Sequence, residues 1–66
     1  MKIEQLVKNL ENTIDGKVAL RNSYQEYISE ENRGSSNFYA LNAAIQFINL
    51  NIKELKDILT AVKSVE

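Results

Sequence analysis

The sequence predicts an all-α fold, an antiparallel two-helix hairpin that assembles into a homo-oligomeric helical bundle, with four helices if the assembly is a dimer. Proline is absent and glycine occurs only twice in 66 residues, so little interrupts helix formation. Apolar residues recur at helical spacings in two long segments. A chain this short buries only about 60% of its unfolded surface, and such small cores usually need a partner.

The first segment is expected to form a helix from about residue 3 to about residue 31. Asp15 and Gly16 give a turn signal in its middle. Both project away from the apolar face, and an interior glycine costs only about 1 kcal/mol relative to alanine. We therefore favour one helix with a weak point or a kink here, with two separate helices as the alternative. At 100° per residue one broad face collects Ile3, Leu6, Val7, Leu10, Ile14, Val18, Leu20, Tyr24, Tyr27 and Ile28.

Residues 32–36 are expected to form the turn of this single hairpin domain, which spans residues 1–66. Gly34 can adopt the left-handed conformation that ends a helix, and Ser35 or Ser36 can cap the next one. Without a histidine to activate them, we interpret these serines as caps rather than nucleophiles. Because the connection is short, the two helices should lie antiparallel.

The second helix is expected from about residue 37 to about residue 64, and it carries the strongest pattern in the chain. Its apolar residues alternate in spacings of three and four, which predicts coiled-coil-like packing at a shallow crossing angle. Both helices would be about 40–45 Å long, so two hairpins could pair along their length. The seam consists of Phe38, Leu41, Ile45, Ile48, Ile52, Leu55, Leu59 and Val62.

The second helix also has more apolar surface than one seam can use. A helix that is apolar on most sides is buried on most sides, so a flank beside the seam should meet another subunit or a target protein. This predicted oligomer interface consists of Ala40, Ala44, Phe47, Ile58, Ala61 and Val65. Asn42, Gln46 and Asn49 are interpreted as the solvated side, with an amide-rich docking face as the alternative. The layout resembles that of the small plasmid-copy-control hairpin dimers in architecture only, and no function is transferred from it.

Two basic residues lie within the apolar face of the first helix. Lys17 and Arg21 are one turn apart, and charges at such positions lose hydration unless a partner compensates for it. One interpretation is a site for a small anionic ligand such as a nucleotide, formed by Lys17 and Arg21 with Tyr24 and helped by Arg33. The structural alternative is that long stems lie along the apolar surface, or that either cation pairs with Glu54 or Asp57 on the antiparallel helix or on a neighbouring chain.

Three carboxylates close the first helix at Glu26, Glu30 and Glu31, where the helix dipole disfavours negative charge. They are interpreted as a solvated face, with a contact surface for a basic partner as the alternative. A carboxylate metal site would need further inward-facing ligands, and none is apparent in the sequence.

The composition disfavours several classes of function. The chain has no histidine and no cysteine, so no metal site, cofactor or enzymatic activity is expected. A net charge of −1 disfavours nucleic-acid binding. The uncharged run from Gly34 to Ile52 is long enough to suggest a membrane span, but its amides disfavour one. With no signal-peptide core after Met1, a cytoplasmic location is expected.

The leading hypothesis is a small interaction protein that self-associates and binds or inhibits a macromolecular partner, as a regulator, an adaptor or a phage-type inhibitor of a host protein. The partners expected are therefore a second copy and another protein. One alternative is an oligomeric binder of a small anionic ligand at Lys17, Arg21 and Tyr24. Another is a structural element of a larger assembly, which would co-purify with a particle in fixed ratio.

Overall fold

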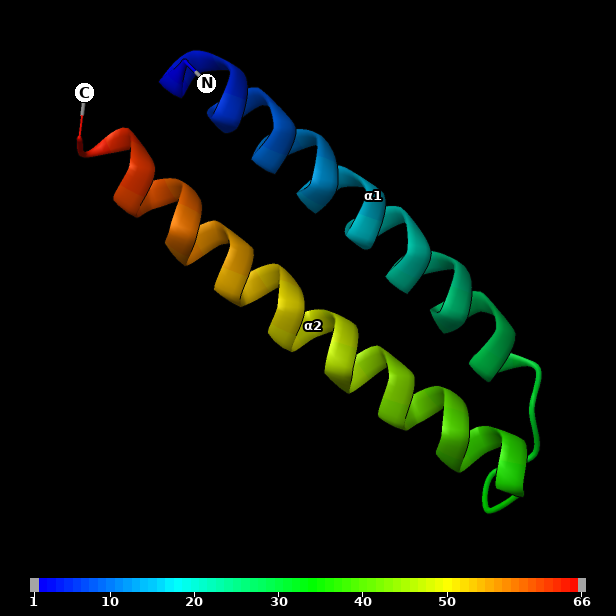
Figure 1. The fold of residues 1–66 in the computed structure, drawn as a ribbon. Coiled ribbons are helices and arrows are strands. Elements are labelled where there is room, and N and C mark those ends of the chain that lie inside the picture. Colours follow the sequence, from blue (N-terminus) through cyan, green and yellow to red (C-terminus); the bar gives the residue numbers. More distant parts are fainter. Residues whose placement is uncertain (1, 66) are drawn as a thin grey trace.

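In the computed structural model, which describes residues 2–65, the chain forms two long helices lying side by side (Figure 1). Helix α1 spans Ile3–Ser29 and helix α2 spans Ser36–Lys63. The helices run antiparallel, so α1 begins and α2 ends at the same end of the rod (Figure 1). The described residues contain no strand, and the predicted all-α hairpin is confirmed.

Helix α1 continues without a break through Asp15 and Gly16, both of which are exposed. A Cβ atom added to Gly16 would meet nothing within 4 Å. The helix ends at Ser29, two residues before the expected end. There the Ser29 hydroxyl donates to the Glu26 carbonyl oxygen at 2.7 Å, and the following carboxylates oppose the helix dipole. No basic residue lies in this last turn to offset them.

The connection between the helices is shaped by Gly34 and Ser35. Gly34 has φ 90°, a left-handed conformation that glycine adopts without steric cost. The Ser35 hydroxyl then accepts a hydrogen bond from the Phe38 amide at 3.0 Å. This cap satisfies one of the free amides at the start of α2, so the helix begins at Ser36.

The seam of α2 faces α1 along the whole hairpin. All eight predicted seam residues are buried or half-buried, and Ile45, Ile48 and Ile52 are at most 7% exposed. On α1 the only comparably buried side chain among the described residues is Ile14. Ile14, Ile48 and Ile52 form the centre of the core, and Val18, Tyr24, Leu55 and Leu59 pack against it.

The hairpin is a rod of 48 × 15 × 14 Å with a radius of gyration of 15.2 Å. A compact domain of this length has a radius of gyration of about 11 Å. No described side chain is less than 2% exposed. The core is therefore a single line of contacts with no second layer to cover it.

Neither helix, within residues 2–65, contains a stretch that is both long enough and apolar enough to cross a membrane.

Candidate functional site

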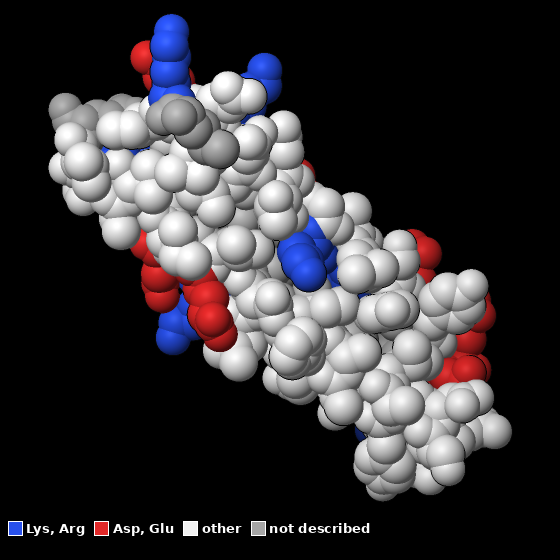
Figure 2. Space-filling model, in the orientation of Figure 1, with Lys and Arg blue, Asp and Glu red and all other residues white. Residues whose placement is uncertain are grey.

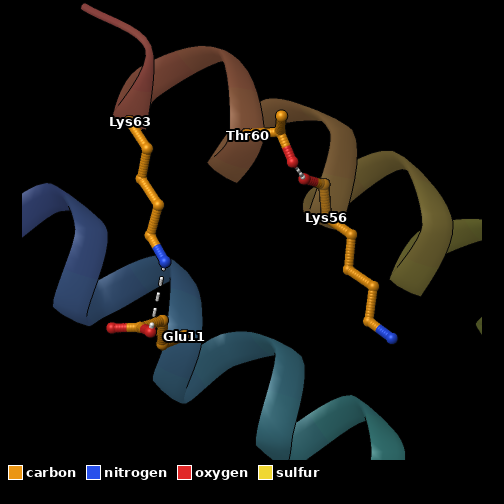
Figure 3. Close-up of polar contacts among 4 residues, drawn as sticks. All are labelled: Glu11, Lys56, Thr60 and Lys63. Carbon is orange, nitrogen blue, oxygen red and sulfur yellow. Dashed lines mark hydrogen bonds and ion pairs between the residues drawn. The ribbon is translucent and has the colours of Figure 1, made fainter. Parts of the chain in front are cut away.

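The two sides of the seam can be told apart by which residues stand next to it in the sequence. Glu11 follows the seam residue Leu10, and Lys63 follows Val62. The Lys63 ammonium lies 3.9 Å from a Glu11 carboxylate oxygen (Figure 3). Residues that follow seam positions therefore share one side of the hairpin, and residues that precede them share the other, as in antiparallel coiled coils.

The side that follows the seam is charged, and we call it the charged face. Glu11 and Lys63 are both about half exposed there, and Lys56 extends from α2 nearby (Figure 3). The Thr60 hydroxyl donates to the Lys56 carbonyl at 3.0 Å, within α2. Charges of both signs are mixed on this face, which is typical of a solvated surface. Its charged residues are Glu4, Lys8, Glu11, Asp15, Lys53, Lys56 and Lys63.

The side that precedes the seam is apolar, and we call it the apolar face. Its residues are Leu6, Leu20 and Tyr27 from α1, with Ala40, Ala44, Phe47, Ile58, Ala61 and Val65 from α2 and its C-terminal end. Leu20, Phe47 and Ile58 are 43%, 67% and 49% exposed. Figure 2 shows one broad side of the rod that is uncharged over most of its area, with a basic patch near its middle and acidic groups along its edges. All six residues of the predicted oligomer interface lie on this face.

The middle of α1 places Arg21 at a seam position, where it is half-buried. Its Nη1 donates to the Asn49 side-chain oxygen on α2 at 3.1 Å, and its Nη2 donates to that of Asn22 at 3.3 Å. Its Nε is buried and has no hydrogen-bond partner among the described residues. A buried donor without a partner costs about 1–3 kcal/mol, so Arg21 is the polar weak point of the seam.

The other three predicted ligand-binding residues are placed differently. Lys17 is half-buried one turn before Arg21, and its ammonium forms no ion pair with residues 2–65. Tyr24 packs against the core beside them. Arg33 is exposed in the connection at the tip, beyond the end of α1. The fold therefore brings Lys17, Arg21 and Tyr24 onto one stretch of helix and leaves Arg33 apart.

Two details of the sequence interpretation are corrected here. Within the chain, Arg21 pairs with Asn49 rather than with Glu54 or Asp57. Asn42 and Gln46 are exposed as expected, but Asn49 is half-buried. The reason is that Asn49 directly follows Ile48 in the seam, so its amide reaches the guanidinium across the helix pair. The position of Asn49 directly after a seam residue is the feature of the sequence that indicates its partial burial.

The acidic end of α1 forms a shallow hollow lined by Glu26, Tyr27 and Glu30. The two carboxylates of this hollow do not indicate a particular ligand. Within residues 2–65, no group of three or more carboxylates is arranged to hold a metal ion.

Comparisons of the chain with protein-family models, curated proteins and solved structures found no match. Function is therefore inferred from the chain's own residues.

Proposed function

We propose that this chain is a non-enzymatic interaction protein that self-associates through the apolar face and then binds or inhibits a macromolecular partner. The observation that carries the proposal is the exposure of that face. Five large apolar side chains on it are between 43% and 72% exposed, namely Leu20, Tyr27, Phe47, Ile58 and Val65. Contiguous exposed apolar patches on small proteins mark interaction surfaces.

The total exposed area supports the same proposal. The hairpin exposes 5062 Å², whereas a globular monomer of 7.5 kDa exposes about 4,200 Å². The excess of about 800 Å² equals the area that one partner typically buries in a stable protein–protein interface. Covering one side of the rod would therefore give the chain the burial that an ordinary globular protein has.

The side-chain chemistry supports a non-enzymatic role. The chain has neither histidine nor cysteine, the residues most often used as general base and as activated nucleophile near neutral pH. The only buried polar side-chain atom without a partner in the described residues is Arg21 Nε, which is a permanent donor. A guanidinium can bind an anion, but it is a poor proton carrier.

The decisive experiment is the mass of the full chain by sedimentation equilibrium over a wide range of concentration. We expect twice the chain mass of 7.5 kDa, or a higher multiple. Phe47→Asp should weaken self-association by about 30-fold or more, because it would bury a charge among apolar side chains. Gln46→Asp, at the neighbouring exposed position off the apolar face, should leave the mass unchanged.

A monomeric mass at every concentration would overturn the proposal. So would equal effects of Phe47→Asp and Gln46→Asp, because the apolar face would then have no special part in assembly.

The macromolecular partner would meet a different surface. Tyr39 and Leu50 are 63% and 54% exposed on α2, and neither belongs to the apolar face. If they contact the partner, Leu50→Glu should remove the protein that co-purifies from the native source while the assembly keeps its mass. Loss of self-association together with the partner would count against a separate docking surface.

A second candidate function, binding of a small anion, is favoured by the unpartnered Nε of Arg21 next to Lys17. Titration calorimetry with inorganic phosphate and with ATP would test it. Arg21→Met should abolish the heat of binding, and Lys56→Met, an exposed cation on the charged face, should retain it. The absence of binding by the unchanged protein would exclude this candidate for both ligands.

A further inference from the structure

The hydrogen bond between Arg21 and Asn49 indicates which residues of α1 and α2 lie at similar heights along the long axis of the rod. The two side chains meet at 3.1 Å, so their positions on α1 and α2 are at similar heights. Lys17 lies four residues from Arg21 and Glu54 lies five residues from Asn49, both toward the end where α1 begins and α2 ends (Figure 1). At ~1.5 Å per residue, Lys17 and Glu54 lie at nearly the same height.

Lys17 and Glu54 have opposite charges, and both lie on the apolar side of the rod. On α2, Glu54 is one heptad from Phe47 and one heptad from Ala61, so it stands in a row of the apolar face. Lys17 occupies the seam of α1 beside Leu20 and is half-buried. Within the chain, their side chains form no ion pair with each other or with other described residues. Arg21, which donates to the amide oxygens of Asn49 and Asn22, has no ion pair within residues 2–65 either. The apolar side therefore has unpaired charges of both signs, which favours a partner with the same charges.

Two arrangements allow a second copy to cover the apolar face with twofold symmetry. Rotation about the long axis of the rod lays α1 over the partner's α2 and keeps every residue at its own height. Lys17 then meets the partner's Glu54, and the contact occurs twice. Rotation end over end lays α1 over the partner's α1. Because Lys17 is near the middle of Ile3–Ser29, it would then face the partner's Lys17.

Side-chain size agrees with the first arrangement. Counted from Arg21 and Asn49, Tyr27 and Ala44 fall at similar heights, as do Thr13 and Ile58. Laying α1 over the partner's α2 therefore sets a large side chain against a small one at both places, as close packing requires. Gly16 lies at the height of Glu54, and open space surrounds it, which leaves room for the glutamate stem.

We propose that two copies of this chain pair by rotation about the rod's long axis, with α1 over the partner's α2, so that Lys17 of each chain pairs with the partner's Glu54. This inference rests on the proposed self-association through the apolar face. It adds the arrangement of the chains and the residues that select it. The excess exposed area of about 800 Å² fits one such partner.

The test uses full-length chains with reversed charges. Lys17→Glu alone should weaken self-association by at least about tenfold, because two carboxylates would meet in each of two places. Glu54→Lys alone should weaken it similarly. When the two variants are mixed, each contact joins opposite charges again. The heterodimer, measured by native mass spectrometry, should then exceed the statistical half of all dimers.

The control is a mixture of Lys56→Glu and Glu4→Lys, which carry the same net charges as the test variants but change exposed residues on the charged face. It should form heterodimers close to the statistical proportion. A preference no greater in the test mixture than in the control overturns the inference and leaves self-association standing. An unchanged affinity of Lys17→Glu also overturns it. If the unchanged chain is monomeric, the inference and the proposed function both fail.

Discussion

The charged face and the apolar face flank the same seam, yet they meet solvent in different ways. On the charged face, Glu11 and Lys63 bridge the two helices and remain about half exposed to water. On the apolar face, Phe47 and Ile58 are 67% and 49% exposed, and no ion pair with residues 2–65 compensates for the charge of Lys17. The first face pairs opposite charges within one chain, whereas the second leaves large apolar side chains exposed to solvent.

This difference shows how a small hairpin can divide its surface. A rod with a one-line core cannot bury a second row of side chains by itself, so apolar residues outside the seam are available for association. Concentrating them on one side directs association there. In the proposed assembly, charges on the other side would keep the particle soluble and limit further growth.

The largest expected loss of stability comes from substitution of a seam residue, which both faces flank. Ile48 is 6% exposed in the seam. Its substitution by alanine should lower the free energy of unfolding by about 2–5 kcal/mol, because the hairpin cannot fill the cavity that the smaller side chain leaves. Leu50→Ala, two residues away at an exposed position, should change it by less than about 1 kcal/mol. Urea unfolding at one protein concentration measures both. Similar losses at the two positions would contradict the assigned seam.

The next effect compares two tyrosines with the same exposure. Tyr27 on the apolar face and Tyr39 outside it are both 63% exposed. Tyr27→Ala should cost about 1–2 kcal/mol in the assembled protein, because a covered ring loses its contacts. Tyr39→Ala should cost at most about 1 kcal/mol, from its edge-on contact with Phe38.

Protein concentration separates the two tyrosine variants. The loss caused by Tyr27→Ala should increase with protein concentration, because the covered state is favoured by mass action. The loss caused by Tyr39→Ala should stay constant in thermal unfolding across the same series. If both losses are independent of concentration, the apolar face is not covered.

A smaller effect tests the polar contact that crosses the seam. Arg21→Met should raise the free energy of unfolding by about 1 kcal/mol, because it removes a half-buried charge with an unpartnered Nε and keeps an apolar stem. Asn49→Ala should lower it by about 1 kcal/mol in the original chain. In the Arg21→Met background the same change should cost much less. Additive effects in this double-mutant cycle would show that the hydrogen bond contributes nothing.

The smallest effect belongs to the charged face. Glu11→Gln removes the ion pair with Lys63, whose groups are about half exposed. Exposed pairs contribute about 0–1 kcal/mol, and we expect a loss of at most about 0.5 kcal/mol. The loss should disappear at high salt, which screens the pair. Thermal unfolding at low and high salt measures it, and a loss that persists at high salt would mean that Glu11 has a packing role.

Much of the hairpin could be predicted because its signals are local. The alternating spacing of Ile45, Ile48 and Ile52 gives the seam, and Gly34 followed by Ser35 gives the tip, as the backbone angle and the cap hydrogen bond confirm. Helix α1 ends at Ser29, within two residues of the end that the sequence indicates. Carboxylates are compatible with a helix, but at its C-terminal end they oppose its dipole, and the Ser29 hydroxyl bonds there to the Glu26 carbonyl.

The candidate site was predictable only in part. Lys17 and Arg21 interrupt an apolar face and so attract notice in the sequence. The partner of Arg21 depends on the register between the helices, and the register is set by packing across the seam and by the length of the connection. For that reason Asn49, 28 positions away, was assigned to the solvated side.

By itself, the sequence determined two long helices, the seam that joins them and a surplus of apolar residues on α2, because each depends on spacing within one segment. Only the tertiary structure decided which residues share a side. The register pairs Arg21 with Asn49 and Glu11 with Lys63, and it places Lys17 and Glu54 at nearly the same height. These relations join residues far apart in the chain, and the packing of two helices fixes them all together.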